Sequence, residues 1–169
     1  MTIPVIPETR KPEFSVRDGV RKLEFDGVHL SESSSRLPKK PRWVEFSLYR
    51  TPKGVYVLSR VGFSIFYHSK ECYTVSRNSL SPVDGLTLSA EYVACSTCRP
   101  SRTDEEGVFP ETPRYAAWSC TDALGVVHSL MKEDENGTEY LTNVARRLLV
   151  DAAKIDAEIA DAFYVDRIE

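Results

Sequence analysis

The sequence lacks long apolar runs and is poor in glycine. No segment of the 169 residues approaches the roughly 20 consecutive apolar residues that cross a bilayer. Only 8 residues are glycine, which excludes a collagen-like repeat, and 41% are hydrophobic, which is too many for a globally disordered chain. Residues 1–8 lack the basic and apolar segments of a signal peptide. We therefore expect a cytoplasmic protein with its own core and no membrane association.

The signatures of several common enzyme classes are also missing. The chain contains no Walker loop, no G-x-G-x-x-G, no H-E-x-x-H and no G-x-S-x-G motif. No H-x-E motif precedes the C-x2-C pair described below, so the zinc deaminase pattern fails as well. Carboxylates are frequent in the C-terminal third, but their helical spacing is typical of a solvated face. We therefore predict no catalytic residue and favour a binding protein over an enzyme.

The cysteines and one histidine form two closely spaced pairs. His68 and Cys72 make an H-x3-C pair, and after 22 intervening residues Cys95 and Cys98 make a C-x2-C pair followed closely by a proline. Without a secretory signal, such spacing favours metal or redox chemistry over disulfides. One imidazole and three thiolates at tetrahedral angles make a closed zinc site. We therefore predict one zinc ion held by these four residues.

The wider pattern resembles the Ada-type zinc-binding module. The matching residues are Tyr67, His68, Cys72, Ser89, Ala90, Tyr92, Cys95, Cys98, Arg99 and Pro100. In that family, two ligands separated by three residues are followed by a strand, a helix and a C-x2-C pair near a proline. Such modules head bacterial alkylation-response regulators and are appended to secreted nucleases and competence-type proteins. The resemblance covers residues 63–102 and implies the same four ligands, with zinc in a structural role.

One position departs from that family. In the alkylation-repair regulators the first ligand is a cysteine, whose thiolate accepts a methyl group from a DNA phosphotriester, and this chain has His68 there. Because zinc-bound imidazole is a poor methyl acceptor, the repair activity is not carried over, whereas the structural role is. An alternative stays open, in which His68 is an ordinary histidine at a strand end and Cys120 is the fourth ligand. Otherwise Cys120 is a buried helix cysteine.

The first half of the chain is typical of short strands. We expect a flexible, proline-containing arm over residues 1–14, followed by a single compact domain over residues 15–169. Residues 16–30 indicate one or two strands, and residues 31–41 form a loop rich in serine and proline. Apolar residues alternate in residues 42–50, a turn follows at residues 51–54, and residues 54–60 and 63–68 are two further strands. Together these three strands predict an antiparallel meander.

Helices are predicted for the C-terminal third. Residues 115–131 carry apolar side chains at helical spacing, with Thr121 or Asp122 as the N-cap. After a turn at Asn136 and Gly137, residues 142–163 form an amphipathic helix of about six turns. The predicted fold class is α+β: an antiparallel β-meander with an inserted or appended small zinc-binding module, over residues 63–102, and C-terminal helices in a helical part over residues 114–166.

The charge is distributed unevenly along the chain. Residues 1–60 contain 12 Lys and Arg against 7 Asp and Glu, whereas residues 101–169 contain 7 against 15. Basic residues interleaved with aromatic ones offer phosphate contacts and stacking platforms, although a basic loop before an ordinary hairpin would look the same. The candidate nucleic-acid-binding residues are Arg36, Lys39, Lys40, Arg42, Arg50 and Lys53.

These observations predict a zinc-stabilised binding protein that is nucleic-acid-associated or regulatory, with DNA or RNA bound by the basic N-terminal half. The alternative is a protein-interaction module, such as a phage or mobile-element inhibitor or adaptor, which would act through the acidic C-terminal half.

Overall fold

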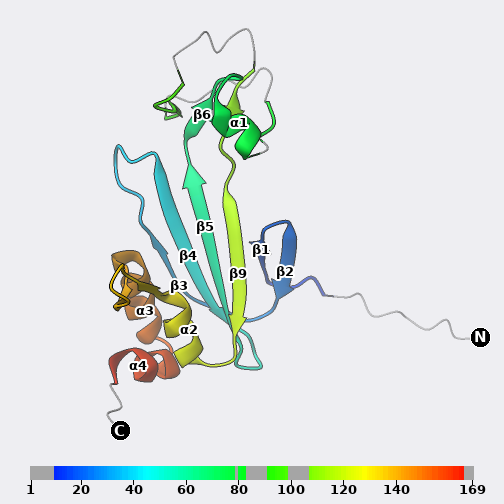
Figure 1. Cartoon of the computed structure of the whole chain (residues 1–169). Coiled ribbons are helices and arrows are strands. Elements are labelled where there is room, and N and C mark those ends of the chain that lie inside the picture. Colours follow the sequence, from blue (N-terminus) through cyan, green and yellow to red (C-terminus); the bar gives the residue numbers. More distant parts are fainter. Residues whose placement is uncertain (1–9, 79, 83–90, 99–106, 166–169) are drawn as a thin grey trace, which may run out of the picture.

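The computed structural model describes residues 10–78, 80–82, 91–98 and 107–165. Its largest element is a four-stranded antiparallel sheet with strand order β3-β4-β5-β9 (Figure 1). The four strands are β3 (Val28–Ser34), β4 (Arg42–Arg50), β5 (Tyr56–Ser64) and β9 (Arg114–Cys120). Three of these strands are consecutive in the chain, so an antiparallel meander is present, but it consists of β3, β4 and β5 rather than of the three predicted strands.

The first and the last strand of the meander differ from the predicted ones. The predicted loop at residues 31–41 is wrong in its first part, because residues 31–34 belong to β3 and the hydroxyl of Ser31 bonds the carbonyl of Leu148 2.9 Å away. The predicted third strand at residues 63–68 is also wrong. The chain leaves the sheet at Ile65, whose N–H donates to the carbonyl of Pro41 (2.9 Å), and residues 66–68 join another sheet.

The turn between β4 and β5 was predicted correctly. The N–H of Gly54 donates to the carbonyl of Thr51 over 2.9 Å, which closes a four-residue turn. Gly54 has a φ of +82°, in the left-handed region that favours glycine. The turn holds β4 and β5 in a register that pairs Arg50 with Tyr56 at this end and Arg42 with Ser64 at the other.

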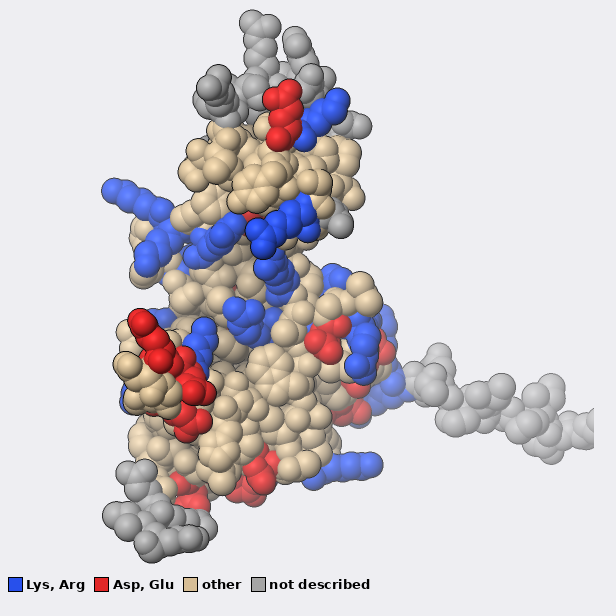
Figure 2. All heavy atoms as spheres, viewed as in Figure 1, with Lys and Arg blue, Asp and Glu red and all other residues tan. Residues whose placement is uncertain are grey.

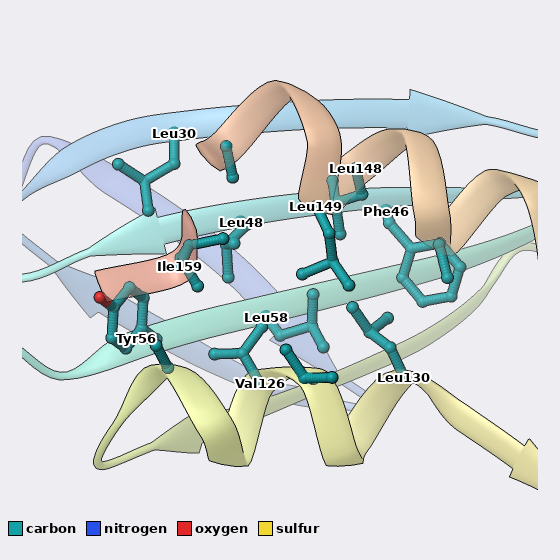
Figure 3. Close-up of a cluster of buried hydrophobic side chains, with 14 of the residues drawn as sticks. Leu30, Phe46, Leu48, Tyr56, Leu58, Val126, Leu130, Leu148, Leu149 and Ile159 are labelled. Carbon is teal, nitrogen blue, oxygen red and sulfur yellow. The ribbon is translucent and has the colours of Figure 1, made fainter. Parts of the chain in front are cut away.

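Three helices cover one face of the sheet at the end away from β6 (Figure 1). They are α2 (Ala123–Leu130), α3 (Asn143–Ala153) and α4 (Ala157–Tyr164). Their buried side chains, which include Leu148 and Ile159, meet Leu48 and Leu58 of the central strands (Figure 3). A hairpin of β10 (Met131–Glu133) and β11 (Glu139–Leu141) connects α2 to α3 and turns at Gly137, near the predicted position. We call the main sheet with these helices the body.

Two predicted helices differ from the observed ones. Residues 114–120 are strand β9 rather than the start of a helix, and α2 begins after Asp122, whose carboxylate caps the N–H of Gly125. The predicted six-turn helix is two helices, because the carboxylate of Asp156 accepts from the N–H of Ile159 and starts α4 anew. Thr142 caps α3 as expected. No helix in the described part of the chain is long and apolar enough to cross a membrane.

The opposite face of the sheet carries a two-stranded hairpin. Strands β1 (Phe14–Asp18) and β2 (Arg21–Phe25) pack through Val16 on Val57 and Ala117, as a second, smaller cluster. The hairpin begins at Phe14, the last residue of the predicted arm, and residues 1–9 of that arm lie outside the described residues. β9 is therefore contacted on both faces, which explains why its apolar residues do not show a simple alternation.

A small unit is inserted between β5 and β9, over residues 65–113; we call it the inserted module. Its described elements are β6 (Phe66–His68), α1 (Tyr73–Arg77), β7 (Val93–Ala94) and β8 (Phe109–Pro110). β6 is the central strand, parallel to β7 and antiparallel to β8. The module lies beyond one end of the main sheet (Figure 1). The predicted module is thus inserted rather than appended, and it includes β8, which follows the predicted boundary.

Candidate metal centre

The four predicted ligands come from the ends of two neighbouring strands. His68 ends β6 and Cys95 follows β7, and the pairing of Tyr67 with Ala94 places these two residues side by side. A tight turn follows each of these residues and brings the second ligand of its pair close to the first. The N–H of Cys72 donates to the carbonyl of Ser69 (3.0 Å), and the N–H of Cys98 donates to that of Cys95 (2.9 Å). The H-x3-C and C-x2-C spacings therefore direct four side chains to one point.

The separations of the donor atoms suit a tetrahedral site. One N or S atom from each of the four residues lies within 4.8 Å of the others. His68 Nδ1 is 3.5 Å from Cys72 Sγ and 3.8 Å from Cys98 Sγ. A tetrahedral ion with bonds of ~2.0 Å to nitrogen and ~2.3 Å to sulfur needs an N–S separation of about 3.5 Å. The four side chains thus lie close enough together to hold a metal ion.

The other nitrogen of His68 is fixed by a carboxylate. His68 Nε2 is 2.9 Å from Glu111 Oε1, and Glu111 is held in turn by two contacts from Arg42, of 2.6 and 3.2 Å. An N–H on Nε2 that donates to Glu111 leaves the lone pair on Nδ1, which faces the sulfurs. Burial raises the pKa of Glu111, but the hydrogen bonds from Arg42, Ser64 and His68 and the charge of Arg42 together outweigh this effect and lower the pKa. Glu111 is therefore a carboxylate that orients the histidine.

The thiols have unequal tendencies to ionise. Burial raises the pKa of Cys72, but hydrogen bonds from Thr74 and Thr97 outweigh it and lower the pKa to about 6. The Thr97 hydroxyl, 2.9 Å from Cys95 Sγ, lowers the pKa of Cys95 as well. Burial raises the pKa of Cys98, although the N–H of Ser69 donates to its sulfur over 3.4 Å. These contacts thus favour the thiolate form of two of the three sulfurs, which is the form that binds a metal.

The site is closed to most of the solvent. His68 is 1% exposed and Cys72 and Cys98 are 8% exposed each, while Cys95 is partly exposed. Four protein donors fill a tetrahedral shell and leave no position for a substrate or a reactive water. This arrangement can fix the chain around an ion, and it lacks the open position of a catalytic zinc.

The alternative prediction, in which Cys120 is the fourth ligand, is wrong. Cys120 ends β9 opposite Tyr56, whereas the metal cluster lies beyond the other end of β5. Its side chain is 7% exposed in the core of the body, with the sulfur 3.5 Å from the hydroxyl of Ser129. The prediction of Cys120 as a small buried hydrophobe fits this position, although the residue ends a strand rather than lying in a helix.

The structure separates the six candidate basic residues into two groups. Four lie at the end of the sheet that carries the inserted module; they are Arg36, Lys39, Lys40 and Arg42. Arg50 is at the opposite end of β4, where its guanidinium lies 2.9 Å from Asp156 and 2.7 Å from Glu158. Lys53 lies in the turn beside it. The six residues therefore do not share one surface, and Arg50 pairs within the body.

Two further arginines lie outside the six candidates: Arg60, which belongs to the basic first part of the chain, and Arg114, which the sequence reasoning missed. Arg60 and Arg114 face the same side of the sheet as Arg42, because their pairing partners alternate in phase with it. The helices cover only the half of that face that lies away from the inserted module (Figure 1). Figure 2 shows Lys and Arg side chains gathered between the inserted module and the body on the visible face. The alternation of side chains along the strands could have placed both arginines on this face. No local sequence pattern, by contrast, indicates that Glu111 contacts His68.

No protein-family model matches the chain, and comparisons with curated proteins and with solved structures find no significant similarity. The function is therefore argued from the geometry of the site itself.

Proposed function

We propose that the metal is zinc and that its role is structural. Three thiolates and one imidazole form a soft, tetrahedral donor set, which suits redox-silent Zn(II). The observation that supports this proposal most strongly is the convergence of four N and S atoms within 4.8 Å, with the histidine oriented by a carboxylate. Zinc would then hold β6, β7 and α1 together in the inserted module.

The resemblance to the Ada-type module supports the same assignment. The four residues that match its ligands are the four that cluster, whereas the matching Ser89, Ala90, Arg99 and Pro100 lie outside the described residues. The first ligand remains His68, so we propose that this chain shares the zinc arrangement of that module and not its methyl transfer.

We further propose that the protein binds nucleic acid at the junction between the inserted module and the body. The support for this proposal is the group of basic side chains there, contributed by the β3–β4 connection and by one sheet face (Figure 2). Two of them, Lys39 and Lys40, form no ion pair with any described residue. Cations that are not neutralised by the protein can replace the counterions of a phosphate backbone.

Salt-dependent binding tests the nucleic-acid proposal. Replacing Lys39 and Lys40 together with alanine should weaken binding to any sequence and flatten the dependence of log K on log salt by about 1.5 units, since each lost phosphate contact removes 0.7 to 0.9. A matched control replaces Lys53 and Lys154, which lie away from the junction, and should leave the isotherm unchanged. Absence of binding by the parent protein at low salt would overturn the proposal.

A second candidate is a protein-binding role for the acidic helical half. A groove of about 980 Å³ lies between α2, the β10–β11 hairpin and α4. Leu124 and Tyr140 line it and are 52% and 44% exposed, with Glu139 and Glu158 among the neighbouring residues. This role predicts a partner that is retained after nuclease treatment, is lost from a Leu124→Asp variant, and is still bound by the Lys39 and Lys40 variant. A partner that is lost on nuclease treatment would contradict it.

A further inference from the structure

A pocket of about 580 Å³ lies where the β3–β4 connection meets the inserted module. Its apolar lining includes Leu37 and Trp43 from the body and Ile65 and Val93 from the module. We propose that this pocket binds an unpaired base of a single-stranded nucleic acid, with the adjoining phosphates on Lys39 and Lys40. The inference rests on the proposed nucleic-acid function and specifies the form of nucleic acid and the site.

Two residues that line the pocket, Arg36 and Trp43, belong to a stack of flat side chains. Trp43 stacks on Phe63 with ring centroids 5.3 Å apart and an angle of 17° between planes, and the guanidinium of Arg36 lies 4.5 Å from the centre of the Trp43 ring. Phe63 comes from β5 and Arg36 follows β3, on opposite sides of β4, so Trp43 lies between them. Arg36 is the outermost member of the stack, and bases stack on guanidinium planes as they do on aromatic rings.

The side chain of Arg36 is accessible to a ligand at the pocket. Its side chain is 53% exposed, and Glu91 of the inserted module lies 3.4 Å from its Nη2. Because the N–H groups of a guanidinium lie in its plane, this hydrogen bond meets the edge of the group and not its face. Around it, Leu37 and Val93 are 53% and 44% exposed, which leaves apolar surface in contact with water. A base is flat and apolar on its faces, so it would cover both the guanidinium and these side chains.

The backbone of the β3–β4 connection places a lysine where glycine is favoured. The N–H of Lys40 donates to the carbonyl of Leu37 (3.2 Å), and Pro38 and Lys39 are the central residues of this turn. Lys39 has a φ of +69°, and among the described residues it is the only non-glycine with positive φ. With proline second, this is a type II turn, whose third position favours glycine. A side chain kept in an unfavourable backbone conformation points to a use for its charge.

The pocket favours single strands over duplexes. In a duplex each base is stacked between its neighbours and paired, so its face cannot reach a guanidinium set in a pocket. An unpaired base can reach the guanidinium without the free-energy cost of breaking a base pair and its stacking. Two lysines on the pocket rim would then contact the phosphates beside it, without reading sequence.

Binding of the intact full-length protein to matched strands tests the proposal. Fluorescence anisotropy would compare a ten-nucleotide DNA strand, an RNA strand of the same sequence, a strand with the same phosphates but abasic central positions, and the duplex. We expect the better of the two intact strands to bind at least about tenfold more tightly than the abasic strand and the duplex, since stacking of one base is worth this much or more.

Two variants test whether Arg36 stacks on the base and whether Lys39 contacts a phosphate. Arg36→Lys keeps the charge but has no plane to stack on, so it should lose the preference for the intact strand while its affinity for the abasic strand is unchanged. Lys39→Gly relieves the backbone conformation, so its thermal unfolding temperature should be equal to or above that of the parent. It should nevertheless bind both strands more weakly, with a salt dependence reduced by about 0.7. Lys53→Gly is the control.

The outcomes separate this inference from the proposed function. Equal binding of intact and abasic strands by the parent, or a duplex bound as tightly as the single strand, would overturn the base pocket and leave nucleic-acid binding standing. No binding of any strand would overturn both. A parent that prefers the intact strand, with that preference unchanged in Arg36→Lys, would show that the base binds elsewhere and would also overturn the pocket.

Discussion

The body and the inserted module are stabilised in different ways. The body buries 16 residues in one continuous apolar cluster between the sheet and three helices. In the described part of the module, α1 has no buried residue, and apart from the cysteine ligands the buried apolar residues are Val108 and Phe109. The hydrophobic effect can therefore maintain the body alone, whereas we expect the module to depend on a bound metal. A substitution that destabilises one unit should therefore leave the other unit folded.

Loss of a thiolate ligand should produce the largest effect. Cys98→Ser removes one of three sulfurs from the proposed zinc site, and structural zinc binding is typically worth about 10–16 kcal/mol at pH 7. We expect no stoichiometric zinc and rapid proteolysis within residues 65–113. Amide hydrogen exchange should still show protection in β4, β5 and α3. Loss of protection throughout the body would contradict the independence of the two units.

Truncation of a core leucine should produce the reverse pattern. Leu148 is 0% exposed and lies in α3 against the sheet (Figure 3). Leu148→Ala should lower the free energy of unfolding of the body by about 2–5 kcal/mol, as measured by urea denaturation. Zinc content should stay at one per chain. A loss below about 0.5 kcal/mol would mean that Leu148 behaves as a surface residue.

Removing the charge that orients His68 should have an intermediate effect on the metal. Glu111→Gln keeps the shape and an acceptor for the Nε2–H but loses the carboxylate charge and its ion pair with Arg42. We expect the affinity for zinc to fall about 10- to 100-fold in competition with a chelator, with the fold retained. Glu91→Gln changes another carboxylate of the module and serves as the matched control. Equal affinities in the two variants would remove the role of Glu111.

The smallest effect on the metal is expected at the remaining cysteine. Cys120→Ser should leave zinc content at one per chain, because Cys120 lies in the core of the body and is absent from the ligand cluster. A buried hydroxyl in its place costs about 1–3 kcal/mol of body stability if it finds no partner. Loss of zinc in this variant would contradict the assignment of the ligands.

The ligands could be predicted from the sequence because their spacing is local. His68 with Cys72, and Cys95 with Cys98, are each brought together by one tight turn, and a turn of that length leaves few alternatives. Glu111 could not be predicted, since it reaches His68 only through the pairing of β8 with β6. The same holds for the pairing of Arg50 with Asp156 across 106 positions.

The errors in the fold arose where the apolar pattern is ambiguous. β9 is covered on one face by the core and on the other by the β1–β2 hairpin, so Ala117 and Trp118 both pack inward and the strand lacks a clear period of two. The break between α3 and α4 preserves the helical spacing of Ala152 and Ile159. The signal available in the sequence was a carboxylate at position 156, suitable for a cap, whereas the 63% exposure of Ile155 is known only from the structure.

X-ray absorption at the zinc edge of the isolated protein tests the central claim most directly. We expect one zinc per chain, surrounded by three sulfurs at ~2.3 Å and one nitrogen at ~2.0 Å. His68→Ala should remove the nitrogen shell or the metal. A shell of four sulfurs, or a parent protein without bound zinc, would contradict the site formed by His68, Cys72, Cys95 and Cys98.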